Sequence, residues 1–159
     1  MSDKRPFDID TIRAEFPILS RDVNGKPLIY LDNAASAQKP DAVIDAIADQ
    51  SRTAYANVHR GLHTLANETT EAYEAAREDV RRFLNAPSAD NIVFARGATE
   101  GINIVANGIV ETIQPGDEIV LSIMEHHSNI VPWHFLRERH GAVVRWVGLN
   151  EDGSLDMAE

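Results

Sequence analysis

The chain has 159 residues, no cysteine and a formal net charge of −10 at pH 7, with 43% hydrophobic and 25% charged residues. This length predicts one globular domain with a substantial core, and the acidic balance argues against nucleic-acid and anionic-membrane partners. Without cysteine the chain offers no disulfide, no cysteine-based zinc site and no thiol nucleophile. No apolar run approaches the ~20 residues that span a bilayer, and no secretory leader pattern follows Met1. We therefore expect no membrane partner and a cytoplasmic location.

The first half of the chain is predicted to be mainly helical, because apolar residues recur there at helical spacing. Pro, Gly and Asn punctuate these helices and mark turns between them. In chain order we expect a helix over residues 10–16, a turn at 24–25, a strand over 28–31, a loop over 32–37, and helices over 43–55 and 68–84.

The second half alternates between strand and helix patterns. We expect strands over 92–94, 118–122 and 143–147, helices over 102–110 and 129–139, and a turn at 150–153 followed by the opening of a helix at 154–156. This alternation predicts a parallel sheet covered by helices. A sheet of three such strands leaves an uncovered edge, so we expect this chain to be the front part of a longer protein.

The segment 96–101 (RGATEG) lies between a predicted strand and a predicted helix. The helix dipole and its first N–H groups point into such a turn, which is the geometry of an anion site. The Thr99 hydroxyl is placed to donate to a phosphate oxygen. The alternative is that Thr99 only caps the helix. The three glycines of a dinucleotide fingerprint are absent.

A second polar segment, 125–129 (EHHSN), follows the strand at 118–122. Ligands of open α/β sheets gather beyond the carboxyl ends of the strands, and histidines there can stack on a planar ligand, move protons or bind metal. The alternative is a polar strand-to-helix loop in which Asn129 caps the next helix.

The segment 57–63 (NVHRGLH) places His59 and His63 four residues apart. On a helix this spacing suits zinc, but Gly61 weakens the helix and no glutamate occupies the HExxH position. Arg60 is able to hold a carboxylate as a two-pronged fork, or to form a structural salt bridge. The three lysines, at positions 4, 26 and 39, are read as solvated surface charges.

Four segments in this order resemble the N-terminal part of a group II, SUF-type cysteine desulfurase, a family of the class V aminotransferases that uses pyridoxal 5′-phosphate (PLP). They are residues 30–40 (YLDNAASAQKP), 58–63 (VHRGLH), 96–103 (RGATEGIN) and 124–133 (MEHHSNIVPW). The resemblance implies an α/β fold, the PLP-dependent transferase fold type I, in partial form. Residues 1–57 would be an N-terminal segment with short helices and a strand, and 58–159 the incomplete start of the large PLP-binding domain.

The resemblance also implies roles for particular residues. The backbone N–H of Ala98 and the side chain of Thr99 would hold the PLP phosphate, and many relatives have threonine at the position of Ala98. His126 would stack on the pyridine ring, whereas the role of His127 is left open. On the substrate side of the cleft the resemblance places His59 and Arg60, together with the loop formed by Asn33, Ala34 and Ala35.

The activity that the resemblance implies is removal of sulfur from L-cysteine or selenium from selenocysteine. L-Cysteine gives L-alanine, and the sulfur passes as an enzyme persulfide to an acceptor protein for iron–sulfur cluster assembly. The complete enzymes are homodimers. This chain contains no Schiff-base lysine motif, no later aspartate to pair with the pyridine nitrogen and no cysteine. We therefore expect these residues alone to be inactive.

Three other interpretations stay open. One is another class V PLP enzyme, such as a selenocysteine lyase or another amino-acid lyase. The second is a non-catalytic, truncated chain that binds a partner subunit. The third is a metal hydrolase that uses the histidines at positions 59, 63, 126 and 127.

Overall fold

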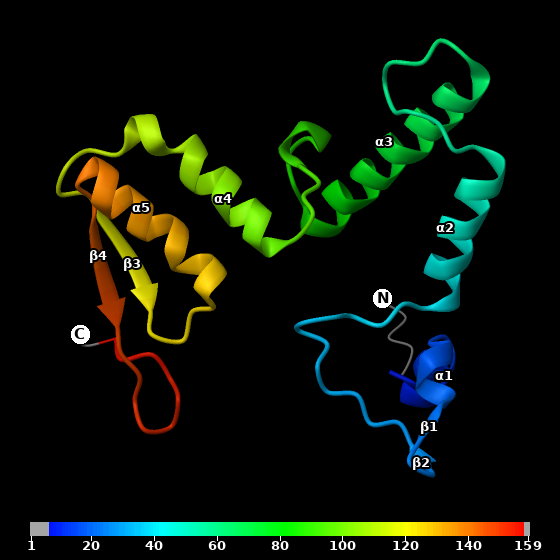
Figure 1. Cartoon of the computed structure of the whole chain (residues 1–159), viewed down its shortest axis with the longest axis horizontal. Coiled ribbons are helices and arrows are strands. Elements are labelled where there is room, and N and C mark those ends of the chain that lie inside the picture. Colours follow the sequence, from blue (N-terminus) through cyan, green and yellow to red (C-terminus); the bar gives the residue numbers. More distant parts are fainter. Residues whose placement is uncertain (1–6, 158–159) are drawn as a thin grey trace, which may run out of the picture. The chain divides into compact units, whose positions relative to one another are not determined.

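The computed structural model describes residues 7–157, and helices supply most of the regular structure (Figure 1). The α-helices are α1 (Ile9–Ala14), α2 (Asp41–Thr53), α3 (Thr64–Leu84), α4 (Ala98–Gly108) and α5 (Val131–His140). The strands are β1 (Asp22–Val23), β2 (Lys26–Pro27), β3 (Glu118–Ser122) and β4 (Val143–Val147). Short 3-10 helices are η1 (Pro17–Ser20), η2 (Ala89–Asn91), η3 (Val110–Thr112) and η4 (His127–Asn129). The helices predicted over residues 10–16, 43–55, 68–84, 102–110 and 129–139 are confirmed, with ends that shift by a few residues.

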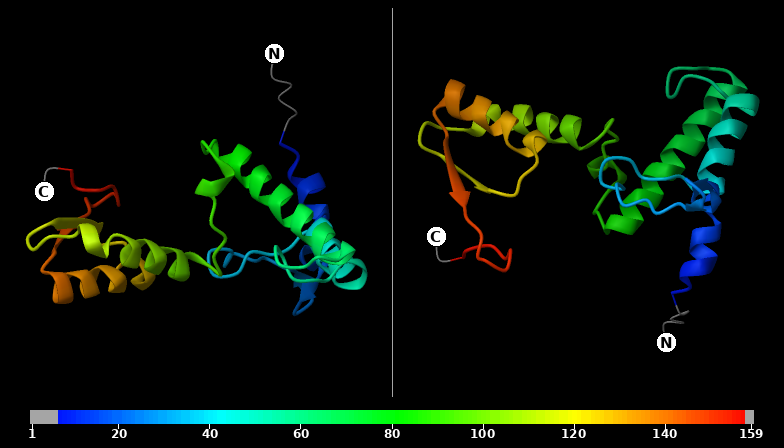
Figure 2. Two further views of the ribbon diagram at one scale, coloured as in Figure 1. Left: turned by 90° about the horizontal axis from the view of Figure 1, so that it is seen from above. Right: turned by 60° about the horizontal axis from the view of Figure 1, so that its bottom comes forward.

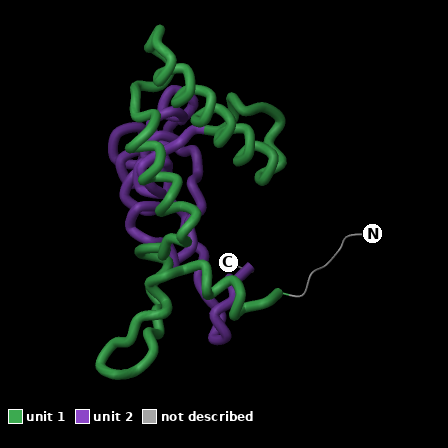
Figure 3. The backbone as a smooth tube through the Cα atoms, turned by 90° about the vertical axis from the view of Figure 1, so that its right-hand side faces the viewer, with its two compact units in different colours: residues 1–92 green, residues 93–159 purple. Residues whose placement is uncertain are grey.

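Backbone contacts divide the chain into two compact units, residues 1–92 and residues 93–159 (Figure 3). The first unit contains α1 to α3 and the second contains α4, α5 and the β3–β4 pair. The boundary at 57/58 concerns the domains of the complete fold and stays a prediction. No helix in residues 7–157 has the length and apolar character to cross a membrane.

The long helix α3 has a defined start and end. His63 is its N-cap, and the Nδ1 atom of His63 accepts the Ala66 N–H at 3.3 Å. Asn85 ends the helix in the left-handed conformation, with φ of 55°, which is a common way to terminate a helix. Arg81 and Arg82 in the last turn complement the negative end of the helix dipole.

The predicted strand over residues 28–31 is wrong. The Asn24-Gly25 turn is confirmed, but it joins only the short antiparallel pair β1–β2, in which Asp22 faces Pro27. Residues 28–31 continue as irregular chain in which Ile29 is 80% exposed. The Tyr30 hydroxyl donates to the carbonyl oxygens of Asp32 and Ser36. Within residues 7–157 no strand lies beside this apolar run to pair with it, so the run does not form a strand.

The second unit contains a β3–α5–β4 motif, in which β3 and β4 pair in parallel from Glu118↔Val143 to Ser122↔Val147. Pro132 lies at the start of α5, where a missing N–H is tolerated. Gly141 ends α5 with φ of 75°, and a Cβ at this position would lie 3.1 Å from Pro115 Cβ. The predicted α/β fold with a parallel sheet is confirmed.

Two predicted elements of this region are wrong. Residues 92–94 form no strand; Ile92 is buried after η2, and its carbonyl oxygen accepts a hydrogen bond from Arg77. The sheet of the described chain therefore pairs two strands. No helix opens at 154–156 within the described residues, because Leu149 and Leu155 form an antiparallel bridge and Asn150 Nδ2 donates to Ser154 Oγ at 3.0 Å.

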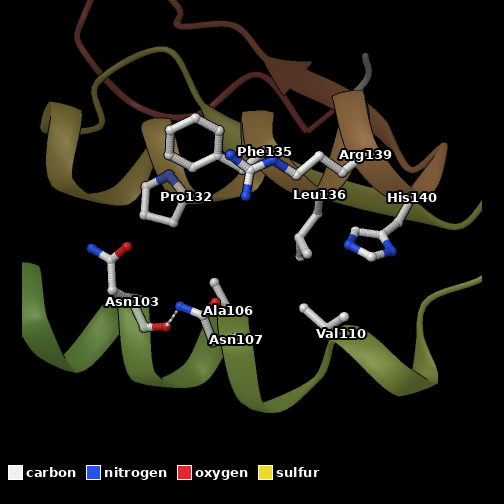
Figure 4. A pocket seen from close by; sticks show the side chains of 9 residues that line it. All are labelled: Asn103, Ala106, Asn107, Val110, Pro132, Phe135, Leu136, Arg139 and His140. Atoms are coloured by element: carbon white, nitrogen blue, oxygen red, sulfur yellow. Dashed lines mark hydrogen bonds between the residues drawn. The ribbon is translucent and has the colours of Figure 1, made fainter.

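Helices α4 and α5 lie side by side and run in the same direction, as the labelled residues of Figure 4 and the views of Figure 2 show. Asn103 faces Pro132 at one end of a groove between the helices, and Val110 faces His140 at the other. The buried apolar side chains of the described part of this unit are Ala106 of α4, Leu121 of β3, Pro132 and Leu136 of α5, and Ala142. The N-termini of both helices therefore lie at one end of the unit.

Candidate functional site

The candidate site is the end of the second unit at which α4 and α5 begin. The loop that follows β3 leads through η4 into α5, and η4 contacts α4. In α/β folds ligands bind beyond the carboxyl ends of the strands. The sequence-predicted residues Ala98, Thr99 and His126 all belong to this unit.

The N-terminus of α4 has no side-chain cap. Gly97 is the N-cap residue, and it has no side chain that could accept a hydrogen bond from the helix. Ala98 and Thr99 are the first two helical residues. The hypothesis that Thr99 only caps the helix is therefore wrong. Ala98 and Thr99 are exposed, and the first N–H groups of a helix have no partners within the helix. The start of α4 thus presents backbone donors and one hydroxyl on the surface.

Charges around this turn are balanced. The Glu100 carboxylate accepts the backbone N–H of Arg96 at 2.5 Å, and the Arg96 Nε atom lies 3.6 Å from Glu100 Oε1. A shallow hollow is lined by Arg96, Gly97, Thr99, Glu100 and Asn103. Because one arginine offsets one glutamate, attraction for an anion comes mainly from the aligned N–H groups and the helix dipole. This donor set fits a phosphate ester.

His126 is the N-cap of η4. The N-cap of α5 is Ile130, and no side-chain hydrogen bond caps this helix, so the expectation that Asn129 caps it is wrong. The Nδ1 atom of His126 accepts the Ser128 N–H at 3.2 Å and lies 2.9 Å from Ser128 Oγ. Accepting from a backbone N–H requires that Nδ1 carry no proton, which places the proton of the neutral ring on Nε2. The His127 ring meets the His126 ring edge to face, with centroids 6.2 Å apart. His126 is exposed.

The sequence analysis missed a chain of side-chain hydrogen bonds that links residues before and after His126. Ser122 Oγ donates to Glu125 Oε1 at 2.9 Å, and Asn129 Nδ2 donates to Glu125 Oε2 at 2.8 Å. The Trp133 indole N–H donates to Asn129 Oδ1 at 2.9 Å. The hydrogen bonds from Asn129 and Ser122 lower the pKa of Glu125 below its ordinary value. Glu125, Asn129 and Trp133 are spaced four residues apart, and this spacing is the one feature of the sequence that could have indicated the hydrogen-bonded chain.

The predicted substrate-side loop lies in the first unit. The backbone N–H groups of Ala35 and Ser36 donate to Asp32 O at 3.2 and 3.1 Å, so the loop of Asn33, Ala34 and Ala35 is a tight turn. All three residues are exposed. Asn33 also lines a hollow together with Arg13, Phe16, Leu19, Tyr30, Ala37 and Gln38.

His59 and Arg60 lie in the loop before α3, also in the first unit. His59 Nε2 lies 3.0 Å from Glu74 Oε1, and the His59 ring meets the Tyr73 ring edge to face at 5.8 Å. Thr70 Oγ1 accepts the His59 backbone N–H at 2.9 Å. His59 is therefore held by α3, whereas the Arg60 side chain is exposed.

The spacing of the histidines does not produce a metal site in the part that the structure describes. His63 caps α3 and His59 belongs to the preceding loop, so the two residues do not share a helix face. Within residues 7–157 no group of three or more His, Asp or Glu side chains is arranged to hold a metal ion.

In a comparison with known families, residues 29–159 match the class-V aminotransferase family. This range contains each of the candidate site residues.

A cysteine desulfurase of Pectobacterium atrosepticum is 57% identical over 154 residues, which is 96% of this chain and 38% of the relative. The apo structure of a cysteine desulfurase from Thermococcus onnurineus matches with a TM-score of 0.85 and 32% identity, over 99% of this chain and 37% of that one. A structure of C-DES with glycine covalently linked to its PLP cofactor matches with a TM-score of 0.66 and 21% identity, over 86% and 33% of the chains. This chain therefore spans about 38% of the length of the curated relative.

Proposed function

The chain belongs to the class V aminotransferase family, and from that premise we propose that it supplies the phosphate-binding and ring-stacking part of a PLP-dependent cysteine desulfurase. The relatives named cysteine desulfurase support the substrate, L-cysteine, and the product, L-alanine. The neighbour with a PLP-linked glycine supports the cofactor.

The observation that carries the proposal is the exposed N-terminus of α4, which has no side-chain cap. In our proposal the backbone N–H groups of Ala98 and Thr99 bind the phosphate of PLP, and the Thr99 hydroxyl donates a further hydrogen bond. These donors are attached to an 11-residue helix, so their dipoles are aligned before the anion arrives. A preorganised site of this kind loses little entropy on binding.

His126 provides the flat surface for the ring. It is the N-cap of η4 in the loop after β3, and its Nδ1 atom accepts the Ser128 N–H, which orients the ring. PLP, when bound, supplies an electron sink for the substrate Cα. The imidazole face of His126 fixes the plane of that sink and shields it from water. His127 is not required for this role.

We propose that His59 and Arg60, and separately the loop of Asn33, Ala34 and Ala35, belong to the substrate side of the complete enzyme. Arg60 is suited to bind the substrate carboxylate, because a guanidinium pairs with a carboxylate through two parallel hydrogen bonds. His59 then acts on Arg60 through the backbone, since its own ring is engaged by Glu74.

The complete reaction needs groups that these 159 residues do not contain. A nucleophilic cysteine must take the sulfur as a persulfide, and the chain has no cysteine. We propose that the isolated chain is inactive, and that the complete enzyme is a cytoplasmic, SUF-type homodimer that passes sulfur to an acceptor protein for iron–sulfur cluster assembly. Selenocysteine is the second substrate in this proposal.

Titration of the ¹⁵N-labelled chain with PLP, and separately with inorganic phosphate, tests the proposal. We expect the backbone amide resonances of Ala98 and Thr99 to shift with both ligands, and the ring ¹⁵N resonances of His126 to shift with PLP alone. Thr99→Val should weaken binding by about tenfold, the size of one lost hydrogen bond to a charged group. Thr112→Val is the matched control, because Thr112 lies just beyond the other end of α4. Equal weakening by both variants, or shifts distributed over the whole chain, would contradict the proposal.

A further inference from the structure

The loop that carries His126 is held at both ends by one continuous set of side chains. Glu125 lies between Ser122, the last residue of β3, and Asn129, the last residue of η4. Asn129 in turn accepts from Trp133 in the first turn of α5. The four side chains are half-buried, so water competes weakly for their hydrogen bonds.

Each oxygen of the Glu125 carboxylate has its own donor, and each polar atom of the Asn129 amide has its own partner. Hydrogen bonds to an ionised carboxylate are stronger than those between neutral groups. The depressed pKa of Glu125, caused mainly by the Asn129 amide, keeps the carboxylate ionised near neutral pH. Every polar atom of the Glu125 and Asn129 side chains therefore has a partner within the set.

We infer that Glu125, Asn129 and Trp133 act as positioning residues that hold His126 with its Nδ1 atom against Ser128 and its Nε2–H turned away from the loop. These three residues are called the brace below. The brace acts through η4: it fixes the two ends of the segment within which the His126 ring caps Ser128. This inference rests on the proposed function only where it concerns PLP.

The brace can be broken and repaired by exchanging its amide and its carboxylate. Asn129→Asp keeps the shape and the acceptor for Trp133, but places a second carboxylate where Glu125 Oε2 had a donor 2.8 Å away. Adding Glu125→Gln restores the match, because the glutamine amide donates to Asp at 129 while its carbonyl oxygen still accepts from Ser122. The double variant therefore has the same number of hydrogen bonds as the original protein.

The first measurement is amide hydrogen exchange in the whole chain without cofactor. Asn129→Asp should speed exchange of the Ser128 N–H, which donates to His126 Nδ1, by about tenfold, the equivalent of one such hydrogen bond. The double variant should return it to the original rate. Exchange of the Gly116 N–H, which donates to Gly141 O at 2.8 Å, should stay unchanged in both. Asn107→Asp is the matched control: it makes the same exchange in α4, at an exposed residue whose Nδ2 atom donates to Asn103 O and takes no part in the η4 contacts.

The second measurement is the absorption band of bound PLP in the same variants. We expect the band to shift in Asn129→Asp and to return in the double variant. If the original chain binds no PLP, the proposed function fails, while Ser128 exchange still decides on the brace. If PLP binds but Ser128 exchange is unchanged in Asn129→Asp, the brace inference fails alone. An equal acceleration at Gly116 would show a general loss of stability and would also overturn it.

Discussion

His59 Nε2 lies 3.0 Å from Glu74 Oε1, although the backbone of His59 is in the left-handed region with φ of 69°. The same helix, α3, also binds the backbone of His59 through Thr70 Oγ1. The side chains of His59 and Glu74 are about half exposed, so the contact between them contributes little by itself. The loop before Arg60 therefore owes its shape to several weak contacts with one helix.

The left-handed backbone of His59 predicts that His59→Ala destabilises the chain more than His59→Gly. Both variants lose the contact with Glu74, but only alanine has a Cβ that disfavours positive φ. We expect a difference of about 1 kcal/mol in the free energy of unfolding, measured by urea denaturation. Equal stability of the two variants would show that the conformation of this loop is not strained.

Gly141 is predicted to tolerate alanine poorly. Its φ is 75°, and a Cβ would lie 3.1 Å from Pro115 Cβ and 3.2 Å from Pro115 Cα. Gly141→Ala should therefore lower the free energy of unfolding by more than about 1 kcal/mol. Gly108→Ala is the control: nothing lies within 4 Å of a Cβ there, and we expect a neutral effect or a gain of up to about 1 kcal/mol. Thermal unfolding of both variants checks the pair.

Neighbouring residues of β3 should respond differently to truncation, because successive side chains of a strand point to opposite faces. Leu121 is 6% exposed, whereas Val120 is 63% exposed. We expect Leu121→Ala to cost about 2–4 kcal/mol and Val120→Ala less than about 1 kcal/mol. Chemical denaturation measures the free energy of unfolding of both variants. A similar loss at both positions would mean that another chain covers the Val120 face in solution.

The brace should make the stability of the second unit depend on pH in the acid range. Hydrogen bonds from Asn129 and Ser122 hold the pKa of Glu125 below its ordinary value of 4.5. A depressed carboxyl pKa stabilises the folded state fully above the unfolded pKa, and this contribution disappears as the pH falls through the lower, folded pKa. We expect Trp133 fluorescence, recorded in a Trp146→Phe background, to report this loss. Glu125→Gln should flatten the profile, and an unchanged profile in this variant would assign the loss to other groups.

Position 98 offers a gain-of-binding experiment. Ala98 is exposed at the first position of α4, beside Thr99. Ala98→Thr adds a hydroxyl next to the proposed phosphate, and we expect PLP to bind several-fold more tightly, up to about tenfold. Ala98→Val, which has the same shape without the hydroxyl, is the control. Equal affinities of the threonine and valine variants would place the phosphate elsewhere.

Local patterns in the sequence predicted the helices and the strands at 118–122 and 143–147, and these elements are present. The α4 turn, with Thr99 at its start, was also visible in the sequence, because a helix satisfies its hydrogen bonds within one segment and its first N–H groups must point outward. The four motifs indicated the family that the comparison shows. These features depend on residues close to one another along the chain.

The tertiary structure decided which apolar runs become strands and which polar residues support the site. Residues 28–31 and 92–94 have strand-like composition but join no sheet in the part of the chain that the structure describes. A strand obtains its hydrogen bonds from a neighbour that local sequence does not specify. Likewise, Asn129 bridges Glu125 and Trp133 while His126 caps η4. Which of several polar side chains caps a turn depends on the angle between β3 and α5, and only the packed structure sets that angle.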